Sequence, residues 1–437
     1  MAVATAVLLT LEQNSSAGRA RLAGLPLPLR AVLSAQRAGV EEILIVGGDP
    51  PARWLGGDRR VQLRWRWIPL GSPDGPTPEV AALRRVAPEL TQPFVLLFAD
   101  SLFEAQALSE LRAAGLEGKM VRVAVPRGGP EEPAKASLYL CSPELFPCLR
   151  DATGDEDLDS FAARLHQQGR SEAVPVSGRL WPRTSDPREL RRIHRELTRF
   201  HLKPSDGIFA RFNKLVVAEP LIRLFLRTRA TPNFITGLGL LLAVASGGAF
   251  VQGSYAWSLL GALLAYFSAL LDHVDGMVAR LKFLESEFGV WFESAADVTS
   301  YLCIFSGMAV GLYRETGFFH HLVVGGLFVL GTVASLITTS WQRRLASADN
   351  PSDYVNRIRS KLEERSENVF HWFTRKCYFL TRRAVLPFFI LIFCLLDWRA
   401  LLLGWVTLGS HVVWILTLYN NRLFLRSRPA STSHKVA

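Results

Sequence analysis

The sequence predicts two domains in different solvents: an α/β three-layer domain in the cytosol and an all-α domain of six transmembrane helices. Its 437 residues suffice for two or three domains, and a hydrophobic content of 49% is high for a purely soluble protein. The first two hundred residues mix charges with short apolar runs, whereas long apolar segments recur from Thr231 onward. We therefore expect an α/β domain over residues 1–200, a juxtamembrane helix over 205–230, the membrane domain over 231–425 and a basic cytosolic tail over 426–437.

The first two hundred residues alternate between strand-like and helix-like patterns. Five apolar runs predict strands: AVLLTL (6–11), EEILIVGG (41–48), VQLRWRWIPL (61–70), PFVLLFAD (93–100) and MVRVAVP (120–126). Helical patterns such as residues 29–38 and 105–114 separate them, and this alternation favours a mostly parallel sheet between two helical layers. Residues 2–11 are apolar over one strand length without a basic leader, so we expect no secretory signal and a cytosolic domain.

Six apolar segments after Thr231 are candidates for membrane helices, each of which needs about 20 residues. They cover residues 232–253, 256–281, 289–313, 318–340, 383–398 and 400–422, and the fifth is the shortest. The connections after the first, third and fifth segments hold few cations, whereas the opposite side holds residues 343–383 with ten Lys and Arg. By the positive-inside rule, this asymmetry predicts a multi-pass protein of the cell (inner) membrane with both termini in the cytoplasm.

The net charge of +11 indicates contact with membrane lipids, because the basic residues cluster beside apolar segments. This placement disfavours nucleic acid as a partner. Residues 205–230 carry apolar residues at helical spacing with Arg and Lys among them, which predicts an amphipathic helix in the membrane interface or, alternatively, an ordinary linker helix. The five cysteines show neither zinc-ligand spacing nor a disulfide framework.

Four acids at helical offsets interrupt the second and third apolar segments. Asp272 and Asp275 are three residues apart, and Glu293 and Asp297 are four apart, so each pair shares one helix face. The short polar turn between the two helices makes them antiparallel neighbours, which brings the acids together. Four carboxylates in a low-dielectric site repel one another unless cations neutralise them, and hard oxygen ligands favour Mg²⁺ or Mn²⁺. We expect two such ions.

Small residues beside these acids indicate that a bulky ligand approaches the helix backbone. Gly276, Ala279 and Gly289 clear space on the acidic faces, and Arg280 can bind a phosphate. The pattern predicts a diphosphate site. Two alternatives stay open: acids that pair with Arg280 and Lys282 for structural reasons, and an ion- or proton-coupled transporter, although we find no inverted repeat. His273 adjoins the acids but is expected on another side of the helix.

This stretch resembles the CDP-alcohol phosphotransferase signature, D-x2-D-G-x2-A-R-x8-G-x3-D-x3-D. Seven of its eight positions are identical, and the third acid is Glu293 in place of Asp. The resemblance extends from about Ser205 to the C-terminus. It implies that Asp272, Asp275, Glu293 and Asp297 hold the metals, and that Asp297 also accepts a proton. It further implies that the CDP-alcohol is bound by Asn233, Phe234, Ile235, Thr236, Gly276, Ala279, Arg280, Ser286 and Gly289.

From this resemblance we expect a membrane transferase that moves a substituted phosphate from a CDP-alcohol to an acceptor hydroxyl and releases CMP. The donor is CDP-diacylglycerol or CDP-inositol, and the acceptor is an alcohol such as a polyol phosphate. Members of the family often form homodimers, so a homodimer is expected here. The extra methylene of Glu293 shifts one carboxylate by about one carbon–carbon bond, which can change metal preference while the charge stays.

The first domain is similar to sugar-phosphate nucleotidyltransferases in LAGLPLPLRAVLSAQRAGVEEILIV (22–46), FVLLFAD (94–100) and SLYLCSPELF (137–146). Fusion to a CDP-alcohol phosphotransferase is known in enzymes that make CDP-inositol and use it on inositol phosphate. The resemblance makes Asp100 the first metal-binding acid. However, residues 10–24 hold only Gly18 before Gly24 and no Lys, and Ser185 stands at the second acid position with Asp186 one place off. We expect either an inactive remnant that positions the membrane domain or an active cytidylyltransferase.

Overall fold

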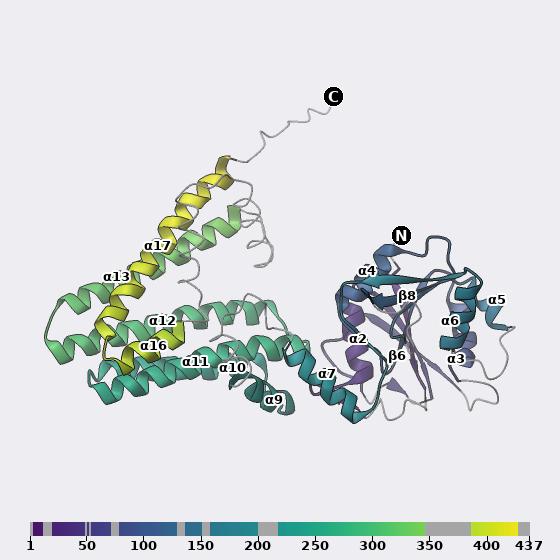
Figure 1. The fold of residues 1–437 in the computed structure, drawn as a ribbon, viewed down its shortest axis with the longest axis horizontal. Helices are drawn as coiled ribbons and strands as arrows, with labels where there is room; N and C mark the ends of the chain where they lie inside the picture. The colour runs from purple at the N-terminus through teal and green to yellow at the C-terminus, as the bar shows by residue number, and fades with distance from the viewer. Residues whose placement is uncertain are drawn as a thin grey trace. The chain divides into compact units, whose positions relative to one another are not determined.

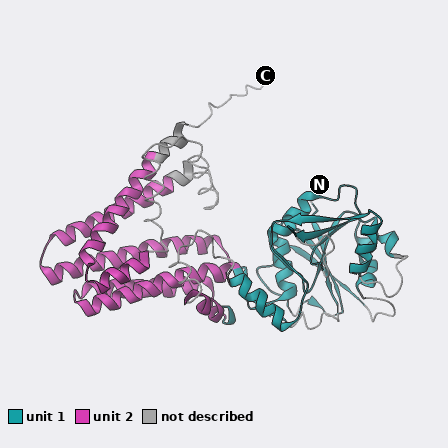
Figure 2. Cartoon of the chain, in the orientation of Figure 1, with its two compact units in different colours: residues 1–201, 226–228, 281–284 teal, residues 202–225, 229–280, 285–437 magenta. Residues whose placement is uncertain are grey.

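The computed structural model describes residues 3–11, 20–48, 50–51, 54–70, 78–128, 136–150, 158–199, 217–345 and 386–426. Contacts divide the chain into two compact units, coloured separately in Figure 2. The first contains residues 1–201, 226–228 and 281–284, and the second contains residues 202–225, 229–280 and 285–437. The amphipathic segment predicted over 205–230 lies partly outside the described residues, as do the basic stretch over 343–383 and almost all of the C-terminal tail.

A seven-stranded sheet forms the first unit, with strand order β10-β8-β9-β6-β1-β4-β5. The strands are β1 (Thr5–Thr10), β4 (Glu42–Gly47), β5 (Arg64–Pro69), β6 (Phe94–Phe98), β8 (Val121–Pro126), β9 (Tyr139–Cys141) and β10 (Ser171–Val176). All neighbours pair in parallel except β9, which runs antiparallel to β6 and β8. The predicted parallel sheet is thus confirmed. Two small two-stranded sheets add β2 (Arg21–Leu22) with β3 (Leu25–Pro26), and β7 (Leu102–Phe103) with β11 (Leu180–Trp181).

Helices cover both faces of this sheet (Figure 1). One core packs α2 (Leu27–Arg37) and α4 (Ala105–Ala114) against Leu8, Ile43 and Leu97. The other packs α3 (Pro78–Val86), α5 (Leu145–Arg150) and α6 (Leu158–Gln167) against Leu9, Leu44 and Phe98. Adjacent strand residues therefore serve opposite cores, because successive side chains of a strand point to opposite faces. This arrangement explains why the central strands are continuous apolar runs. The 3₁₀ turn Ala87–Glu89 follows α3, and α7 (Pro187–Arg199) follows β11.

The second unit is helical. Its elements are α9 (Glu219–Arg227), α10 (Pro232–Val251), α11 (Tyr255–Lys282), α12 (Glu287–Thr316), α13 (His320–Leu345), α16 (Leu386–Leu395) and α17 (Arg399–Arg426). Five stretches are long and apolar enough to cross a membrane: Pro232–Val251, Tyr255–Lys282, Glu287–Thr316, His320–Trp341 and Arg399–Tyr419. The predicted six-span count is not confirmed. The described helix inside the predicted fifth segment, α16, has 10 residues and is about 15 Å long, half the hydrocarbon thickness.

Glycines allow α10 and α12 to touch backbone to backbone. A Cβ added at Gly307 would lie 2.3 Å from the carbonyl oxygen of Gly247, and one at Gly247 would lie 2.5 Å from that of Cys303. Gly311, one turn after Gly307, meets Phe250 in the same way. Small residues at four-residue spacing are the usual route to close helix packing in membranes. The contact fixes α10 beside the helix that carries Glu293 and Asp297.

A buried arginine joins three helices at the ends opposite the acids. Arg399, at the start of α17, has a side chain only 5% exposed. Its guanidinium donates to Ser258 Oγ of α11 at 2.8 Å, pairs with Glu315 Oε2 of α12 at 2.9 Å and reaches Asp397 Oδ1 at 2.6 Å. Each carboxylate therefore has a cationic partner, which is the condition for burying such charges in a membrane protein.

Candidate metal centre in the helical unit

The α11–α12 hairpin places the acids. Asp272 and Asp275 lie on α11, and Glu293 and Asp297 lie on α12. Between the helices, Ser286 caps α12, and its Oγ accepts a hydrogen bond from the Gly289 N–H at 3.0 Å. This N-cap fixes the start of α12, because it satisfies one of the backbone N–H groups that have no partner within the helix. The two acid pairs are thereby brought onto facing helices.

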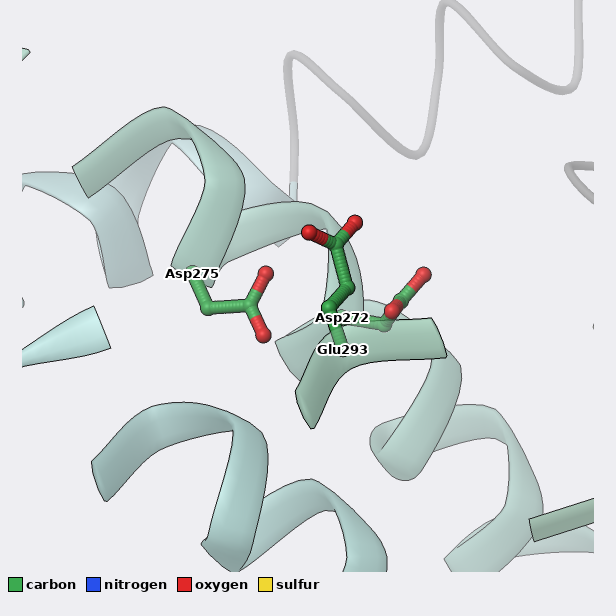
Figure 3. A group of neighbouring side chains, drawn as sticks. All are labelled: Asp272, Asp275 and Glu293. Carbon is green, nitrogen blue, oxygen red and sulfur yellow. The ribbon is translucent and has the colours of Figure 1, made fainter. Parts of the chain in front are cut away.

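Three of the four acids form a group of potential metal ligands. Carboxylate oxygens of Asp272, Asp275 and Glu293 lie within 4.8 Å of one another, and Figure 3 shows the Asp275 carboxyl directed toward the other two. The charge of Asp297, one turn after Glu293 on α12, also acts on Asp272. The structure thus brings together three of the four acids that the sequence analysis singled out, and Asp297 is not a member of this group. Within the described part of the chain, this is the group of three or more potential ligands that can hold a metal ion.

Asp275 is the most informative member of the group. It is 2% exposed, and its Oδ2 accepts a hydrogen bond from Thr236 Oγ1 of α10. Its Oδ1 is buried and makes no hydrogen bond to the described residues. An unmatched buried carboxylate oxygen costs free energy unless a cation binds it. The arrangement fits a hard divalent ion held by carboxylate oxygens.

The residues predicted to bind the CDP-alcohol lie around this group at different depths. Asn233 Oδ1 lies 3.3 Å from the position that a Cβ on Gly289 would take. The guanidinium nitrogens of Arg280 lie 3.6 Å from the position that a Cβ on Gly276 would take. Thr236 is buried, Ile235 is fully buried, and Phe234 is 61% exposed. Ala279 is half-buried, and His273 is exposed.

Sequence reasoning placed Thr236 in the substrate pocket and did not foresee its hydrogen bond to Asp275. The two residues are 39 positions apart on different helices. No periodicity in one helix can pair them, because helical offsets only relate residues three or four apart. The only available signal was the resemblance, which placed residues 233–236 close to the acids without giving a contact.

The predicted metal acid of the α/β unit has different surroundings. Asp100 follows β6 and is 8% exposed. Nearby, the buried Arg183 pairs with Glu79 at 3.2 Å and Asp159 at 2.7 Å, and it stacks on the Phe98 ring at 3.7 Å. Burial lowers the pKa of Arg183, but the charges of Asp159, Glu79, Tyr139 and Asp100 outweigh it and raise this pKa overall.

The same network extends to a buried tyrosine. Tyr139 donates a hydrogen bond to Asp159, and burial together with this carboxylate raises the pKa of Tyr139 well above its ordinary value. Burial also raises the pKa of Glu79, although Arg183 opposes the shift. Asp186, the acid one place off the second metal position, accepts a hydrogen bond from the Arg188 N–H at 2.8 Å at the start of α7. Asp186 therefore acts as a helix cap.

Two family models match the chain. Residues 229–416 match the CDP-alcohol phosphatidyltransferase family, and residues 18–169 match the MobA-like NTP transferase domain. A bifunctional IPC transferase and DIPP synthase from Rubrobacter xylanophilus is 26% identical over 320 residues, which cover 67% of this chain and 72% of that protein. A protein of the same name from Aquifex aeolicus is 26% identical over 260 residues, which cover 59% and 54%.

Solved structures align with the α/β part of the chain. The inositol-1-phosphate CTP transferase from T. maritima is 13% identical, with a TM-score of 0.37, over 45% of this chain and 95% of that one. A structure described as a putative glucose-1-phosphate thymidylyltransferase from Bacillus anthracis is 12% identical, with a TM-score of 0.37, over 44% of this chain and 94% of that one. The family matches and the curated relatives indicate a transferase enzyme. Its CDP-alcohol phosphatidyltransferase-like region contains helices long and apolar enough to cross a membrane, and its first domain is nucleotidyltransferase-like.

Proposed function

We propose that this transferase moves a substituted phosphate from a CDP-alcohol to the hydroxyl of a second alcohol, such as a polyol phosphate, and releases CMP. The buried Oδ1 of Asp275 lacks a hydrogen bond, and the Asp275 carboxyl lies in one group with those of Asp272 and Glu293; this observation carries the proposal. A ligand that brings cations or a diphosphate–cation complex would satisfy this oxygen. The match of residues 229–416 to the CDP-alcohol phosphatidyltransferase family names the chemistry that such a site performs.

The residues of the hairpin have distinct roles in this reaction. Asp272, Asp275, Glu293 and Asp297 would hold two divalent ions, Mg²⁺ or Mn²⁺, which when bound neutralise the diphosphate and the charge that develops on CMP. Arg280 binds a phosphate oxygen from the side of Gly276. The Asp297 carboxylate accepts the proton of the acceptor hydroxyl, whose oxygen bonds to the β-phosphorus. The bond from that phosphorus to the CMP oxygen breaks, and CMP leaves with the electron pair.

Two donors are consistent with this mechanism: CDP-inositol and CDP-diacylglycerol. The names of the curated relatives, bifunctional IPC transferase and DIPP synthase, support CDP-inositol with an inositol phosphate acceptor. The decisive experiment supplies purified protein in nanodiscs with each CDP-alcohol and several polyol phosphates, and follows CMP by mass spectrometry. We expect CMP with one pairing and none after Asp275→Asn. Glu287→Gln, which removes an exposed acid from the same hairpin, is the matched control and should keep activity. Absence of CMP with every pairing would refute the proposal.

The α/β unit is proposed to be catalytically silent and to position the membrane enzyme. The Arg183 guanidinium supplies a permanent internal cation to the acids near Asp100, and Asp186 is engaged at the start of α7. A fixed cation disfavours a second one nearby. The test gives the protein CTP, Mg²⁺ and the same polyol phosphates and measures pyrophosphate. Release that requires the protein would show that cytidylyl transfer persists.

The orientation and assembly of the protein are also proposed. The basic residues beside the apolar segments support a multi-pass protein of the inner membrane, with the α/β unit and the C-terminus in the cytoplasm and the hairpin acids near that side. Labelling of cysteines introduced at each connection, in intact and permeabilised cells, tests this orientation. A homodimer is proposed by resemblance to the family, and mass photometry of nanodiscs checks it. The transporter alternative loses support, because the matched transferase family covers the helices that carry the acids.

A further inference from the structure

We infer that Thr236 is a positioning residue, which orients the Asp275 carboxyl so that Oδ1 faces the metal centre. The inference rests on the proposed function and adds a role for the first membrane helix. Asp275 and Asp272 both lie on α11, whereas Thr236 lies on α10. A third helix therefore acts on the metal centre through one side chain.

The hydrogen bond between Thr236 and Asp275 is buried at both ends. Thr236 is 8% exposed and Asp275 is 2% exposed. Thr236 Oγ1 also lies 3.1 Å from the carbonyl oxygen of Pro232, one turn earlier. A hydroxyl has a single hydrogen, so it donates to one of the two acceptors, and the ionised carboxylate is the stronger one. Oδ2 of Asp275 is thus engaged, and Oδ1 remains for a cation.

This hydrogen bond restricts the rotation of the Asp275 carboxyl, because the terminal χ2 torsion of an aspartate is otherwise broad. Thr236 itself is held in place. Thr231 caps the start of α10 by accepting from the Phe234 N–H at 3.3 Å, and Ile235 is fully buried. One turn further on, Gly239 brings α10 close to α11, where an added Cβ would stand 3.4 Å from the Ser268 carbonyl oxygen. The hydroxyl therefore reaches Asp275 from a fixed point, and the carboxyl plane is fixed with it.

Partners that orient a metal ligand generally affect metal affinity, and their loss costs about 10–100-fold. We expect Thr236→Val, which keeps the shape but removes the hydroxyl, to weaken Mn²⁺ binding by about 10–100-fold. Thr236→Ser keeps a hydroxyl and should bind Mn²⁺ as tightly as the wild type, since the same bond can form. At saturating Mn²⁺ the rate of CMP release by Thr236→Val should recover most of its loss.

Thr338 offers a matched control. It is 7% exposed in α13, and its hydroxyl donates to the Ala334 carbonyl oxygen one turn earlier at 2.8 Å. It thus shares the burial and the local backbone contact of Thr236, without the carboxylate. Thr338→Val should leave Mn²⁺ binding unchanged, which separates the loss of a buried hydroxyl from the loss of the bond to Asp275.

The experiment measures free Mn²⁺ by electron paramagnetic resonance during titration of nanodisc-embedded protein without substrate, and then CMP release against Mn²⁺ concentration. Wild-type affinity in Thr236→Val would overturn the inference, as would failure of Thr236→Ser to restore binding. If Thr236→Val does not fold, the Mn²⁺ affinities of Thr236→Ala and Thr236→Ser are compared instead, since these variants also differ in the hydroxyl. If the wild type releases CMP but these variants bind Mn²⁺ equally, only this inference fails. If the wild type binds no Mn²⁺ and releases no CMP, the proposed function fails first.

Discussion

Both units of the chain bury carboxylates close together, but they neutralise them differently. In the α/β unit, Glu79 and Asp159 converge on Arg183, which lies over the Phe98 ring. In the helical unit, Asp272, Asp275 and Glu293 converge on one another. The first cluster contains its own cation, whereas the second is a group of potential metal ligands. Each unit also has one buried carboxylate oxygen without a hydrogen bond to the described residues, Oδ1 of Asp100 and Oδ1 of Asp275. The comparison shows that burial of acids alone does not mark a metal site, because a protein cation can satisfy them permanently.

The difference also predicts how each cluster responds to its surroundings. A guanidinium stays protonated at any ordinary pH and cannot leave. The Arg183 cluster is therefore complete as soon as the α/β unit folds. The acids of the hairpin must be neutralised by something from solution, which makes their state depend on ion concentration.

Metal removal should have the largest effect. EDTA is expected to abolish CMP release, and Mg²⁺ or Mn²⁺ in excess should restore it, because the hairpin acids have no internal replacement for the ions. Hydrogen exchange, followed by mass spectrometry, should show loss of protection in α11 and α12 upon chelation and no change in β6 or β8. Chelation that leaves activity intact, or failure of both ions to restore it, would remove the metal mechanism.

Asp297→Asn should be the next largest change. Loss of the proton acceptor is expected to lower the rate of CMP release by about 10²–10⁴-fold, the usual contribution of a general base. Folding should be unaffected, since the amide is isosteric with the carboxyl. Steady-state CMP release and the melting curve measure the two effects. Substantial residual turnover would refute the assignment of Asp297 as the base.

Replacing the internal cation tests the other side of the comparison. Arg183→Met leaves Glu79 and Asp159 buried without their partner, and breaking such a pair costs about 3–5 kcal/mol. Arg192→Met is the control, because the Arg192 side chain is 77% exposed. Its ion pair with Glu196 therefore contributes less than ~1 kcal/mol to stability. Urea unfolding, monitored by hydrogen exchange of the β6 amides, measures the free energy of unfolding of the α/β unit in both variants. Equal effects of the two substitutions would contradict a closed ion-pair network in the α/β unit.

The smallest predicted effect concerns the support of the metal centre. Gly307→Ala forces α12 away from α10, where the added methyl would stand 2.3 Å from the Gly247 carbonyl oxygen, and overpacking of this kind costs about 1–3 kcal/mol. Gly248→Ala is the control, since nothing lies within 4 Å of its added methyl. Thermal unfolding in nanodiscs should separate the two. A wild-type melting curve for Gly307→Ala would show that the helices do not depend on this contact.

Much of the fold could be predicted from local patterns. The five predicted strands and the helices at 29–38 and 105–114 all form, because continuous apolar runs and helical periodicity reflect burial directly. The strands β9 and β10 were not predicted. β10 is the edge strand SEAVPV, which is only partly buried and contains a proline, so its pattern is weak. Strand β9 has three residues, too few to show a period.

The site was predictable to the extent that it is periodic. The offsets of three and four residues placed each acid pair on one face, and the polar turn implied a hairpin, so the meeting of Asp272, Asp275 and Glu293 followed. The contact of Thr236 with Asp275 could not be predicted, since it depends on how α10 packs on α11. Likewise, no local pattern indicates that Arg183 meets Glu79 and Asp159 across 104 and 24 positions.

The cluster around Arg399 bears on the aim of the catalytic side chains. Each residue of an α-helix is turned by about 100° from the one before, so sliding or rolling α11 by a single position would point its acids away from α12. Ser258 and Asp272 are 14 residues apart on α11, or about 21 Å along its axis. The guanidinium that contacts Ser258 and Glu315 therefore holds the rotation of both helices about their axes from the end opposite the acids.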